Sequence, residues 1–230
     1  MAAGRLPGYD ALAFPVAHAD TEFERPMNRR EHWERVYTSK QPTEVSWYQP
    51  TPARSLELLR EAGAGPRTSL IDIGGGDSTL VDVVIAERLG TITVLDISGA
   101  ALARAQTRLG ERSRDVTWLE GDVTSVTLPS AAFDIWHDRA VFHFLTGADD
   151  CARYATTAAA ALKPGGALIM ATFAADGPMK CSGLDVRRYS TESLALALGG
   201  AFHLTRSFND VHRTPSGAEQ RFLYSVFRRH

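Results

Sequence analysis

Long apolar runs are missing from this sequence, and so is any surplus of basic residues. The 230 residues contain no apolar stretch of the ~18 residues that a membrane-spanning helix requires, so we expect no membrane partner. The 25 Lys and Arg are balanced by 27 Asp and Glu, which gives a net charge of −2. Because no positive surplus is available to neutralise phosphates, we also expect no nucleic-acid partner.

Cysteine is equally scarce. Cys151 and Cys181 form neither a metal-ligand spacing nor a disulfide framework. We therefore expect free thiols, no metal site and a reducing, cytoplasmic location. The Ala-rich stretch over residues 11–19 is interrupted by Pro15 and lacks a basic region before a compact apolar core, which makes it a poor signal peptide.

What the chain does contain is typical of one soluble domain. Hydrophobic residues make up 44% and charged residues 23% of a length that suits a single domain. Residues 1–26 are rich in Ala, Pro and Gly without any period, and we interpret them as a flexible N-terminal arm. Residues 27–230 then form one domain, for which the sequence allows a monomer or a weak dimer equally.

Two helices are predicted between residues 27 and 66. The first begins at Asn28, a suitable N-cap, and places Trp33 and Tyr37 on one face, because residues four apart are neighbours on a helix. A loop bracketed by prolines follows and contains Trp47. The second helix follows this loop and ends at a pair of glycines.

From residue 68 onward, short apolar segments alternate with helical ones, which is the pattern of a doubly wound sheet. The expected strands cover residues 68–73, 91–96, 115–119, 133–137, 166–173, 201–209 and 220–228. The expected helices cover residues 78–90, 99–112, 148–162 and 190–199. The last two strands are interpreted as an antiparallel pair joined by a turn over residues 212–217. The predicted fold class is therefore α/β, a Rossmann-like doubly wound seven-stranded mixed sheet, mostly parallel with an antiparallel last strand, preceded by an N-terminal helical arm.

The most informative segment is a glycine turn between two of these strands. Asp72, Gly74, Gly75 and Gly76 end a strand and open a helix, and Asp96 ends the next strand. Glycine lets the backbone approach a ligand closely, and an acid about 20 residues further on bonds the ribose of a nucleotide-like cofactor. A tight turn without a ligand is the alternative, which the second acid disfavours.

The spacing separates two classes of cofactor. A dinucleotide site has Gly-x-Gly-x-x-Gly, and here Thr79 stands at the position of the third glycine. Asp72 lies two residues before the first glycine, where a carboxylate repels a pyrophosphate but attracts a cationic ligand. The pattern favours S-adenosylmethionine, which carries a sulfonium and an amino group, and leaves a dinucleotide oxidoreductase as the enzyme alternative.

Two acids flank this predicted cofactor. Asp96 is placed to accept bonds from both ribose hydroxyls, with Ile97 beside the adenine, and a neighbouring serine already fills its alternative role as a helix cap. Asp122 follows the third strand and is a candidate partner of the adenine amino group, with Gly121 and Val123 on either side. The alternative for this second acid is an ordinary surface turn.

Titratable side chains gather at the end of the fourth strand. His137, Asp138 and Arg139 end it, and His143 lies nearby. Because ligands of open α/β sheets bind outside the carboxyl ends of the strands, we expect these groups at the site. We predict His137, Asp138 and His143 as catalytic residues and His137 also as a cofactor contact. In the alternative, Asp138 pairs structurally with Arg139, and His143 faces solvent or the core.

The order of these motifs resembles that of class I S-adenosylmethionine-dependent methyltransferases. Ser78 departs from the pattern, because many members carry a third glycine there. The resemblance covers about residues 68–175 and rests on Asp72-x-Gly74-x-Gly76, Asp96, Gly121-Asp122-Val123, the strand of Asp134 and Leu162-Lys163-Pro164-Gly165-Gly166.

The flanking segments resemble a bacterial subgroup that is similar to the citrate synthase lysine methyltransferase and the elongation-factor lysine methyltransferases. The segments that carry this likeness are residues 32–37, 42–48, 137–145 and 180–184. In the wider family the arm closes over the cofactor, which implies that Trp33, Tyr37 and Trp47 cover it here. The implied organisation is a helical lid (27–66), a cofactor-binding core (67–175) and an acceptor side with edge strands (176–230).

The implied reaction is in-line methyl transfer to a nucleophile, with S-adenosylhomocysteine as product. A general base is needed only if the acceptor arrives protonated, as a lysine would. The acceptor stays open between a protein lysine and a small molecule such as a thiol, a carboxylate or a natural product, and a non-catalytic cofactor-binding protein is the third alternative. The predicted cofactor contacts are Trp33, Tyr37, Trp47, Asp72, Gly74, Gly75, Gly76, Asp96, Ile97, Gly121, Asp122, Val123 and His137.

Overall fold

The structure, a computed structural model, describes Met1 and residues 28–230. All but the first residue of the predicted N-terminal arm therefore lies outside the described residues. Within the described part of the chain, no helix combines the length and the apolar character needed to cross a membrane.

The core of the molecule is a seven-stranded sheet with the strand order β3-β2-β1-β4-β5-β9-β8. Strands β1 to β5 pair in parallel, whereas β9 runs antiparallel to both of its neighbours. The prediction of a mostly parallel Rossmann-like sheet with an antiparallel last strand is confirmed. The strands are β1 (Ser69–Ile73), β2 (Thr91–Asp96), β3 (Val116–Glu120), β4 (Phe133–Arg139), β5 (Leu162–Phe173), β8 (Phe202–Arg213) and β9 (Glu219–Arg229).

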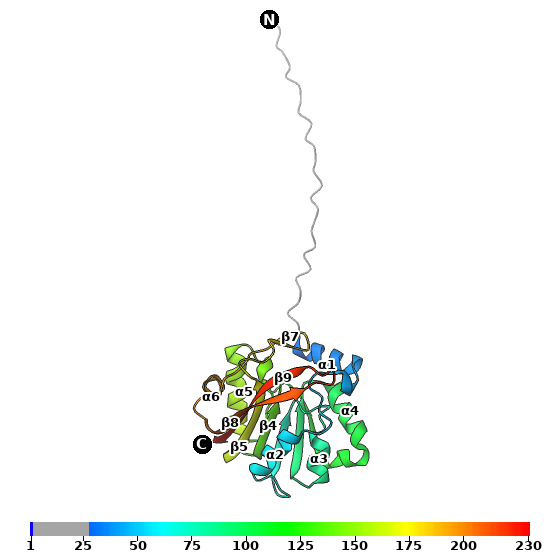
Figure 1. Cartoon of the computed structure of the whole chain (residues 1–230), viewed down its shortest axis with the longest axis vertical. Helices are drawn as coiled ribbons and strands as arrows, with labels where there is room; N and C mark the ends of the chain where they lie inside the picture. Colours follow the sequence, from blue (N-terminus) through cyan, green and yellow to red (C-terminus); the bar gives the residue numbers. More distant parts are fainter. Residues whose placement is uncertain (2–27) are drawn as a thin grey trace.

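Helices cover both faces of the sheet, with α2, α3 and α4 on one face and α5 and α6 on the other (Figure 1). Three short 3-10 helices lie in the connections. The helices are α1 (Arg29–Ser39), η1 (Pro42–Glu44), α2 (Ala53–Glu61), α3 (Leu80–Ala86), α4 (Gly99–Leu109), η2 (Gly110–Asp115), η3 (Phe142–Phe144), α5 (Ala148–Ala161) and α6 (Thr191–Leu198).

Alternating side chains of the central strands supply the two apolar clusters between these layers. Leu70 and Ile135 pack towards α2, α3 and α4, whereas their neighbours Ile71 and Trp136 pack towards α5 and α6. Successive side chains of a strand point to opposite faces, so a sheet that is covered on both sides is apolar at every position. This burial explains why neighbouring positions of the central strands are apolar, as Leu70-Ile71 and Ile135-Trp136 are.

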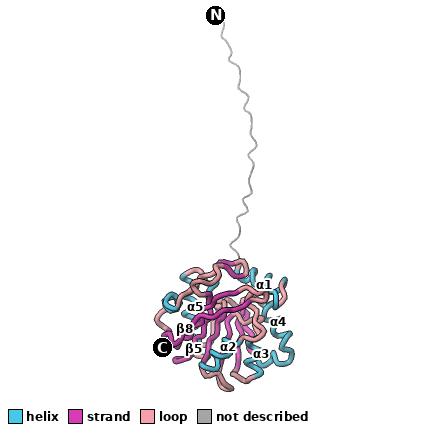
Figure 2. Tube along the Cα trace, viewed as in Figure 1, coloured by secondary structure: helices cyan, strands magenta, loops and turns pink. Residues whose placement is uncertain are grey.

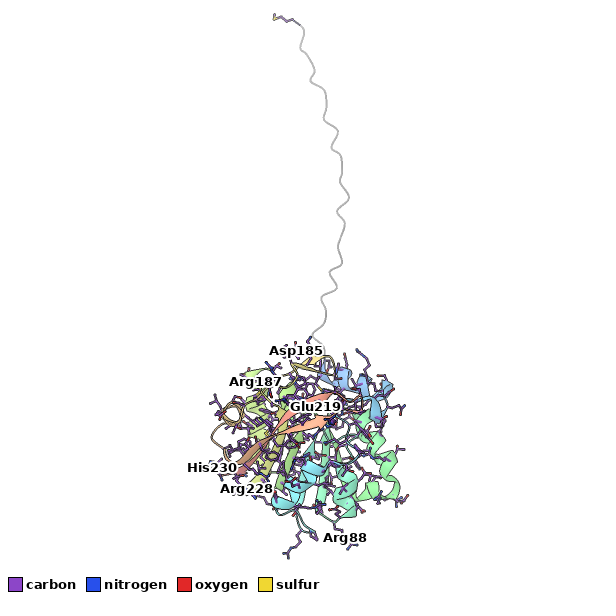
Figure 3. All side chains as sticks on the ribbon, viewed as in Figure 1. Arg88, Asp185, Arg187, Glu219, Arg228 and His230 are labelled. Carbon is purple, nitrogen blue, oxygen red and sulfur yellow. The ribbon has the colours of Figure 1, made fainter. Side chains whose placement is uncertain are left out.

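Helix α1 lies at the end of the molecule where β1, β2 and β4 finish. Its predicted N-cap is confirmed, because the side chain of Asn28 accepts a hydrogen bond from the backbone N–H of Arg30 at 3.0 Å. The two-stranded β6–β7 hairpin (Lys180–Cys181 and Leu184–Asp185) lies at the same end (Figure 1). Figure 2 shows loops meeting there, and Figure 3 labels Asp185 at this end and Arg88 at the opposite one.

Two predicted boundaries differ from the structure. The turn expected over residues 212–217 begins later, because β8 stays paired with β9 as far as Arg213 opposite Glu219. Helix α3 is shorter than the predicted helix over residues 78–90, since the chain leaves helical geometry at Arg88, which has a φ of 54°. The β6–β7 hairpin was not predicted, because a pair of two-residue strands has no periodicity to detect.

Candidate functional site

The glycine turn after β1 lies where two carboxylates meet. A Cβ on Gly75 would collide with Oδ2 of Asp72, and one on Gly76 would lie 2.6 Å from Oδ2 of Asp96. Gly74 has a φ of +65°, and a Cβ there would collide with Val141. These glycines are therefore required by steric contact with the two predicted cofactor-binding acids as well as by backbone conformation.

Replacing Gly76 with Ala is expected to disturb this arrangement without unfolding the sheet. The new methyl group would lie 2.5 Å from Cβ of Ala101 and against the carboxylate of Asp96. We expect the affinity for S-adenosylhomocysteine, measured by calorimetry, to fall at least about tenfold, which corresponds to ~1.4 kcal/mol. Gly200→Ala is the matched control, because a Cβ there meets nothing within 4 Å. Equal affinity in the two variants would contradict the role given to Gly76.

Asp96 ends β2 and is the most strongly organised of the predicted site residues. Its side chain is buried, and its two oxygens accept hydrogen bonds from the backbone N–H of Gly76 at 3.0 Å and of Ser98 at 2.9 Å. Burial raises its pKa from the ordinary 3.8 to about 6, although the backbone donors oppose that shift. Ser98 caps α4 by accepting from Ala101, as the sequence predicts, so Asp96 is not the cap.

Asp72, near the end of β1, is 2% exposed, and one of its two carboxylate oxygens has no hydrogen-bond partner. Its Oδ1 accepts from Nδ1 of His137 at 2.7 Å, and the Nε2 of that histidine lies 2.9 Å from the hydroxyl of Ser55. Its Oδ2 is buried and has no hydrogen-bond partner. A buried carboxylate oxygen without a partner is unfavourable in free energy, so this atom favours a donor from a ligand.

Two adjoining cavities open at this edge of the sheet. The first has about 760 Å³ of empty space that is continuous with solvent, and the second has about 620 Å³. Asp96 and the segment 121–123 line the first cavity, and Asp72 and His137 line the second. The residues shared by both cavities are Tyr37, Trp47, Ile73, Gly74 and Arg139.

Three aromatic side chains of the N-terminal part cover the cavities. Trp33 meets Trp47 edge to face with their ring centres 5.6 Å apart, and it meets Phe144 in the same way at 4.9 Å. The ring centres of Tyr37 and Trp47 are 6.3 Å apart, also in an edge-to-face arrangement. The structure therefore brings the three predicted lid residues together over the site, together with Phe144 from η3.

Helix α1 is fastened to α4 by polar contacts. The carboxylate of Glu34 accepts from the hydroxyl of Ser98 at 2.7 Å and from the backbone N–H of Ala100 at 3.2 Å. Arg104 donates to the backbone carbonyls of Tyr37 and Lys40 at 2.9 and 2.8 Å. A carboxylate at the first turn of α4 also interacts favourably with the helix dipole. These contacts hold the lid in place over the end of β2.

Asp122 lies at the rim of the first cavity between Gly121 and Val123. Its Oδ1 accepts from the backbone N–H and the hydroxyl of Thr124 at 2.8 and 2.7 Å. Its Oδ2 lies 3.7 Å from Nη1 of Arg29 in α1. This carboxylate thus connects the lid to the loop after β3, while its predicted contact with the adenine stays a prediction.

Two of the three predicted catalytic residues, Asp138 and His143, lie deeper than the cavity surface. Asp138 is fully buried and accepts from the hydroxyl of Tyr154 at 2.6 Å and from the N–H of Val141 at 3.0 Å. Burial raises its pKa to about 6. His143 is also fully buried, and its Nδ1 accepts from the N–H of Phe173 at 3.2 Å. Burial, reinforced by the charge of Arg139, lowers the pKa of His143 to about 3.

The structure decides between the alternatives that the sequence left open for Asp138 and His143 at the end of β4. The alternative in which Asp138 pairs with Arg139 is wrong, because neither residue is a partner of the other in the described hydrogen bonds and ion pairs. His143 occupies the core, which was one of the two positions that the sequence left open. His137 is the one predicted catalytic residue that lines a cavity, and both of its ring nitrogens are engaged.

Some cavity residues are absent from the predicted set. Arg139 ends β4 at the same carboxyl edge as His137, so its position was a usable signal. No sequence signal pointed to Arg29 or Ser55, because the packing of α1 and α2 against the sheet is a tertiary contact. The other lining residues of the first cavity outside the predicted set are Ile73, Leu95, Ala140, Val141, Phe144, Leu145 and Cys181.

The central part of the chain matches a known family. Residues 71–170 match the family model described as a methyltransferase domain. Uncharacterized methyltransferases of Mycobacterium bovis and Mycobacterium tuberculosis are 32% identical to this chain over 104 residues, covering 45% of this chain and 50% of each relative. The chain therefore spans about half the length of the curated relatives it matches.

Solved structures share the whole arrangement at low identity. One of these structures is described by the words "Conversion of a Disulfide Bond into a Thioacetal Group during Echinomycin Biosynthesis". It superposes on this chain with a TM-score of 0.72 and is 19% identical to it, over 88% of this chain and 93% of that chain. Another is the 1,6-didemethyltoxoflavin-N1-methyltransferase of Burkholderia thailandensis with bound 1,6-didemethyltoxoflavin and S-adenosylhomocysteine. It has a TM-score of 0.61 at 19% identity and covers 87% of this chain and 83% of that chain. At such identity the likeness shows the fold.

Proposed function

We propose that this chain is an S-adenosylmethionine-dependent methyltransferase. The observation that carries the proposal is the convergence of buried Asp96 and the unpaired oxygen of Asp72 on adjoining cavities beneath an aromatic lid. The match of residues 71–170 to a methyltransferase domain supports it. So do the methyltransferase relatives in two mycobacteria.

The donor groups of the site suit this cofactor. Asp96 offers a buried carboxylate to a ribose diol, and Asp72 offers an unpaired oxygen to an ammonium group. The faces of Trp33 and Trp47 suit a sulfonium cation, because aromatic rings attract cations. Val123, which also lines the first cavity, supplies apolar surface for an adenine ring.

In this reaction the protein would position the methyl acceptor and exclude water from the site. When bound, S-adenosylmethionine supplies an electrophilic methyl group on its sulfonium, and S-adenosylhomocysteine remains. The lid formed by α1 would keep water from the first cavity, and the walls around Arg139 would align the acceptor, since in-line displacement depends on near-attack geometry. His137, placed between Asp72 and Ser55, would hold the Asp72 carboxylate in the orientation that leaves Oδ2 free.

A small molecule is the acceptor that the cavity favours over a protein lysine. The first cavity is roofed by α1, which Glu34 and Arg104 fasten to α4. A cavity beneath a helix accommodates a free metabolite more readily than a side chain on a folded protein. The Burkholderia thailandensis relative, named for its action on 1,6-didemethyltoxoflavin, is a methyltransferase of a small molecule with this fold.

The decisive experiment follows labelled methyl groups. The purified protein is incubated with S-[methyl-³H]adenosylmethionine and a desalted lysate, with and without the small-molecule fraction. We expect label in a small product only when that fraction is restored. Label in a discrete protein band that survives denaturation would identify a protein acceptor instead. Tight binding of S-adenosylhomocysteine without transfer in either arm would support a non-catalytic protein, and preferential binding of NADH would overturn the cofactor assignment.

A further inference from the structure

The guanidinium of Arg139 lines both cavities, and one of its nitrogens has no hydrogen-bond partner. Its Nη1 donates to the backbone carbonyl of Trp47 at 3.0 Å, and its Nε donates to the hydroxyl of Tyr224 at 3.3 Å. Its Cζ lies 4.8 Å from the ring centre of Phe222. The remaining nitrogen, Nη2, is buried and has no hydrogen-bond partner.

Arg139 is also without an anionic partner. In the part of the chain that the structure describes, none of the ion pairs includes this residue, although most other arginines near the lid are paired. Arg139 is partly exposed, but its Nη2 is buried, and a buried part of a cation that is not neutralised is costly in free energy. The planar guanidinium fork matches a carboxylate, because two parallel N–H bonds can form to its two oxygens.

Two neighbours of the guanidinium lie on the side of the site away from Asp72 and Asp96. Tyr224 and Phe222 belong to β9, beyond β5, whereas Asp72 and Asp96 end β1 and β2. Cys181 of the β6–β7 hairpin lines the same cavity. The free nitrogen therefore serves the part of the site that would receive the acceptor.

Neither His143 nor Cys181, whose pKa values the charge of Arg139 lowers, supplies a negative charge. Burial, more than the charge of Arg139, keeps the pKa of His143 low, at about 3. Burial raises the pKa of the Cys181 thiol to about 11, against a hydrogen bond with Ser46 and the charge of Arg139. Both side chains are neutral near pH 7. The carboxylates of Asp72, Asp96 and Asp122 line the same two cavities, but in the described part of the chain none of them forms an ion pair with Arg139.

We propose that Arg139 recognises the carboxylate of a small organic acid, whose apolar part packs among Trp47, Phe144 and Leu145. This inference rests on the proposed function and names its acceptor class. A lysine side chain would bring a second cation next to Arg139, and the repulsion between like charges disfavours it. Arg139 thus selects the class of acceptor and does not take part in the transfer of the methyl group.

Binding of benzoate to the protein saturated with S-adenosylhomocysteine tests this inference by calorimetry. We expect wild type to bind benzoate saturably and at least about tenfold more tightly than the neutral benzamide, a difference of ~1.4 kcal/mol. Arg139→Gln should weaken benzoate at least about 30-fold, as truncating one member of a buried charge pair does. Arg139→Lys should bind with intermediate affinity, because a lysine cannot form the bidentate pair.

Two controls separate the alternatives. Arg187→Gln removes an exposed arginine that lies over the ring of Tyr189, and it should leave benzoate binding unchanged. Arg139→Gln should also leave the affinities for S-adenosylhomocysteine and for 5′-methylthioadenosine, which lacks the amino-acid carboxylate, unchanged. A selective loss of S-adenosylhomocysteine would assign Arg139 to the cofactor carboxylate and overturn the inference.

The remaining outcomes are also decisive. No saturable binding of benzoate to wild type, or tighter binding of n-butylamine, which mimics a lysine side chain, would overturn the inference while leaving the proposed function intact. Failure of wild type to bind S-adenosylhomocysteine at all would instead overturn the proposed function, and the inference with it.

Discussion

Replacing Asp96 with Ala is expected to weaken S-adenosylhomocysteine binding by about 100-fold to 1,000-fold, which corresponds to ~3–4 kcal/mol. The carboxylate is 5% exposed, and backbone N–H groups of Gly76 and Ser98 hold it at the mouth of the first cavity. We expect this orientation to suit two ribose hydroxyls, each of which would form a charge-assisted bond. Isothermal titration calorimetry with the purified variant measures the effect directly.

Asp96→Asn and Asp115→Asn complete this test. The first keeps the shape of the side chain but loses the charge, so it should bind with intermediate affinity and retain the thermal stability of wild type more closely than the alanine variant. The second removes an exposed acid at the opposite end of the neighbouring strand and should bind like wild type. Affinity in Asp96→Ala within about threefold of wild type, a difference of ~0.7 kcal/mol, would refute the role of this acid.

The same acid predicts a pH dependence of binding. Burial raises the pKa of free Asp96 to about 6, so the side chain carries a proton in most molecules below that pH. Because ribose hydroxyls bond best to the ionised form, that proton must leave on binding. We expect the affinity to be constant above about pH 7 and to be about tenfold weaker at pH 5 than on that plateau. Asp96→Asn should remove this dependence, whereas a dependence that persists would point to Asp138.

Tyr154→Phe is expected to lower the free energy of unfolding by about 3–5 kcal/mol, the largest stability effect that we predict. The fully buried hydroxyl of Tyr154 donates to Asp138 at 2.6 Å and accepts from the indole N–H of Trp136 at 2.8 Å. Its removal leaves a buried carboxylate oxygen and a buried N–H without partners. Urea denaturation followed by tryptophan fluorescence and circular dichroism measures the change.

The matched control for this variant is Tyr189→Phe. Tyr189 is 1% exposed and packs in the same apolar cluster, but its hydroxyl meets only the Sγ of Cys151 at 3.8 Å. A loss of about 1 kcal/mol or less is expected, because a weak contact with a thiol contributes little. Equal losses in the two variants would mean that the Asp138 contact contributes no special stability.

The effect of Tyr154→Phe should depend on pH in a defined direction. Burial raises the pKa of Asp138 from 3.8 to about 6, so folding costs more when this carboxyl is ionised. That cost is absent below about pH 4 and fully present above about pH 6. Because the hydroxyl of Tyr154 stabilises the ionised form, the difference between variant and wild type should be largest above pH 6 and should shrink as the pH falls towards 4.

The sequence predicts that Asp72, the glycine turn and Asp96 lie close together, and the structure places them at one edge of the sheet. Asp72, the glycine turn and Asp96 are local features, each tied to the end of a strand. Parallel strands end at one edge of a sheet, so the geometry that brings these residues together follows once the strands are recognised. The parallel strands were recognisable as short apolar segments between helical ones, which is typical of sheets that are covered on both faces. The last two strands were recognisable as an antiparallel pair joined by turn residues.

The acceptor side depends on contacts that no local pattern encodes. The sequence by itself determined the sheet, the glycine turn and the acids at its strand ends, because each depends on residues that are neighbours in the chain or along one strand. Only the tertiary structure decided that His137 lies between Asp72 and Ser55, that His143 is buried, and that Arg139 turns to β9 and away from Asp138. The physical reason is that burial and hydrogen-bond partners are set by side chains that are distant in sequence and meet only when the helices and the β8–β9 pair close around the sheet.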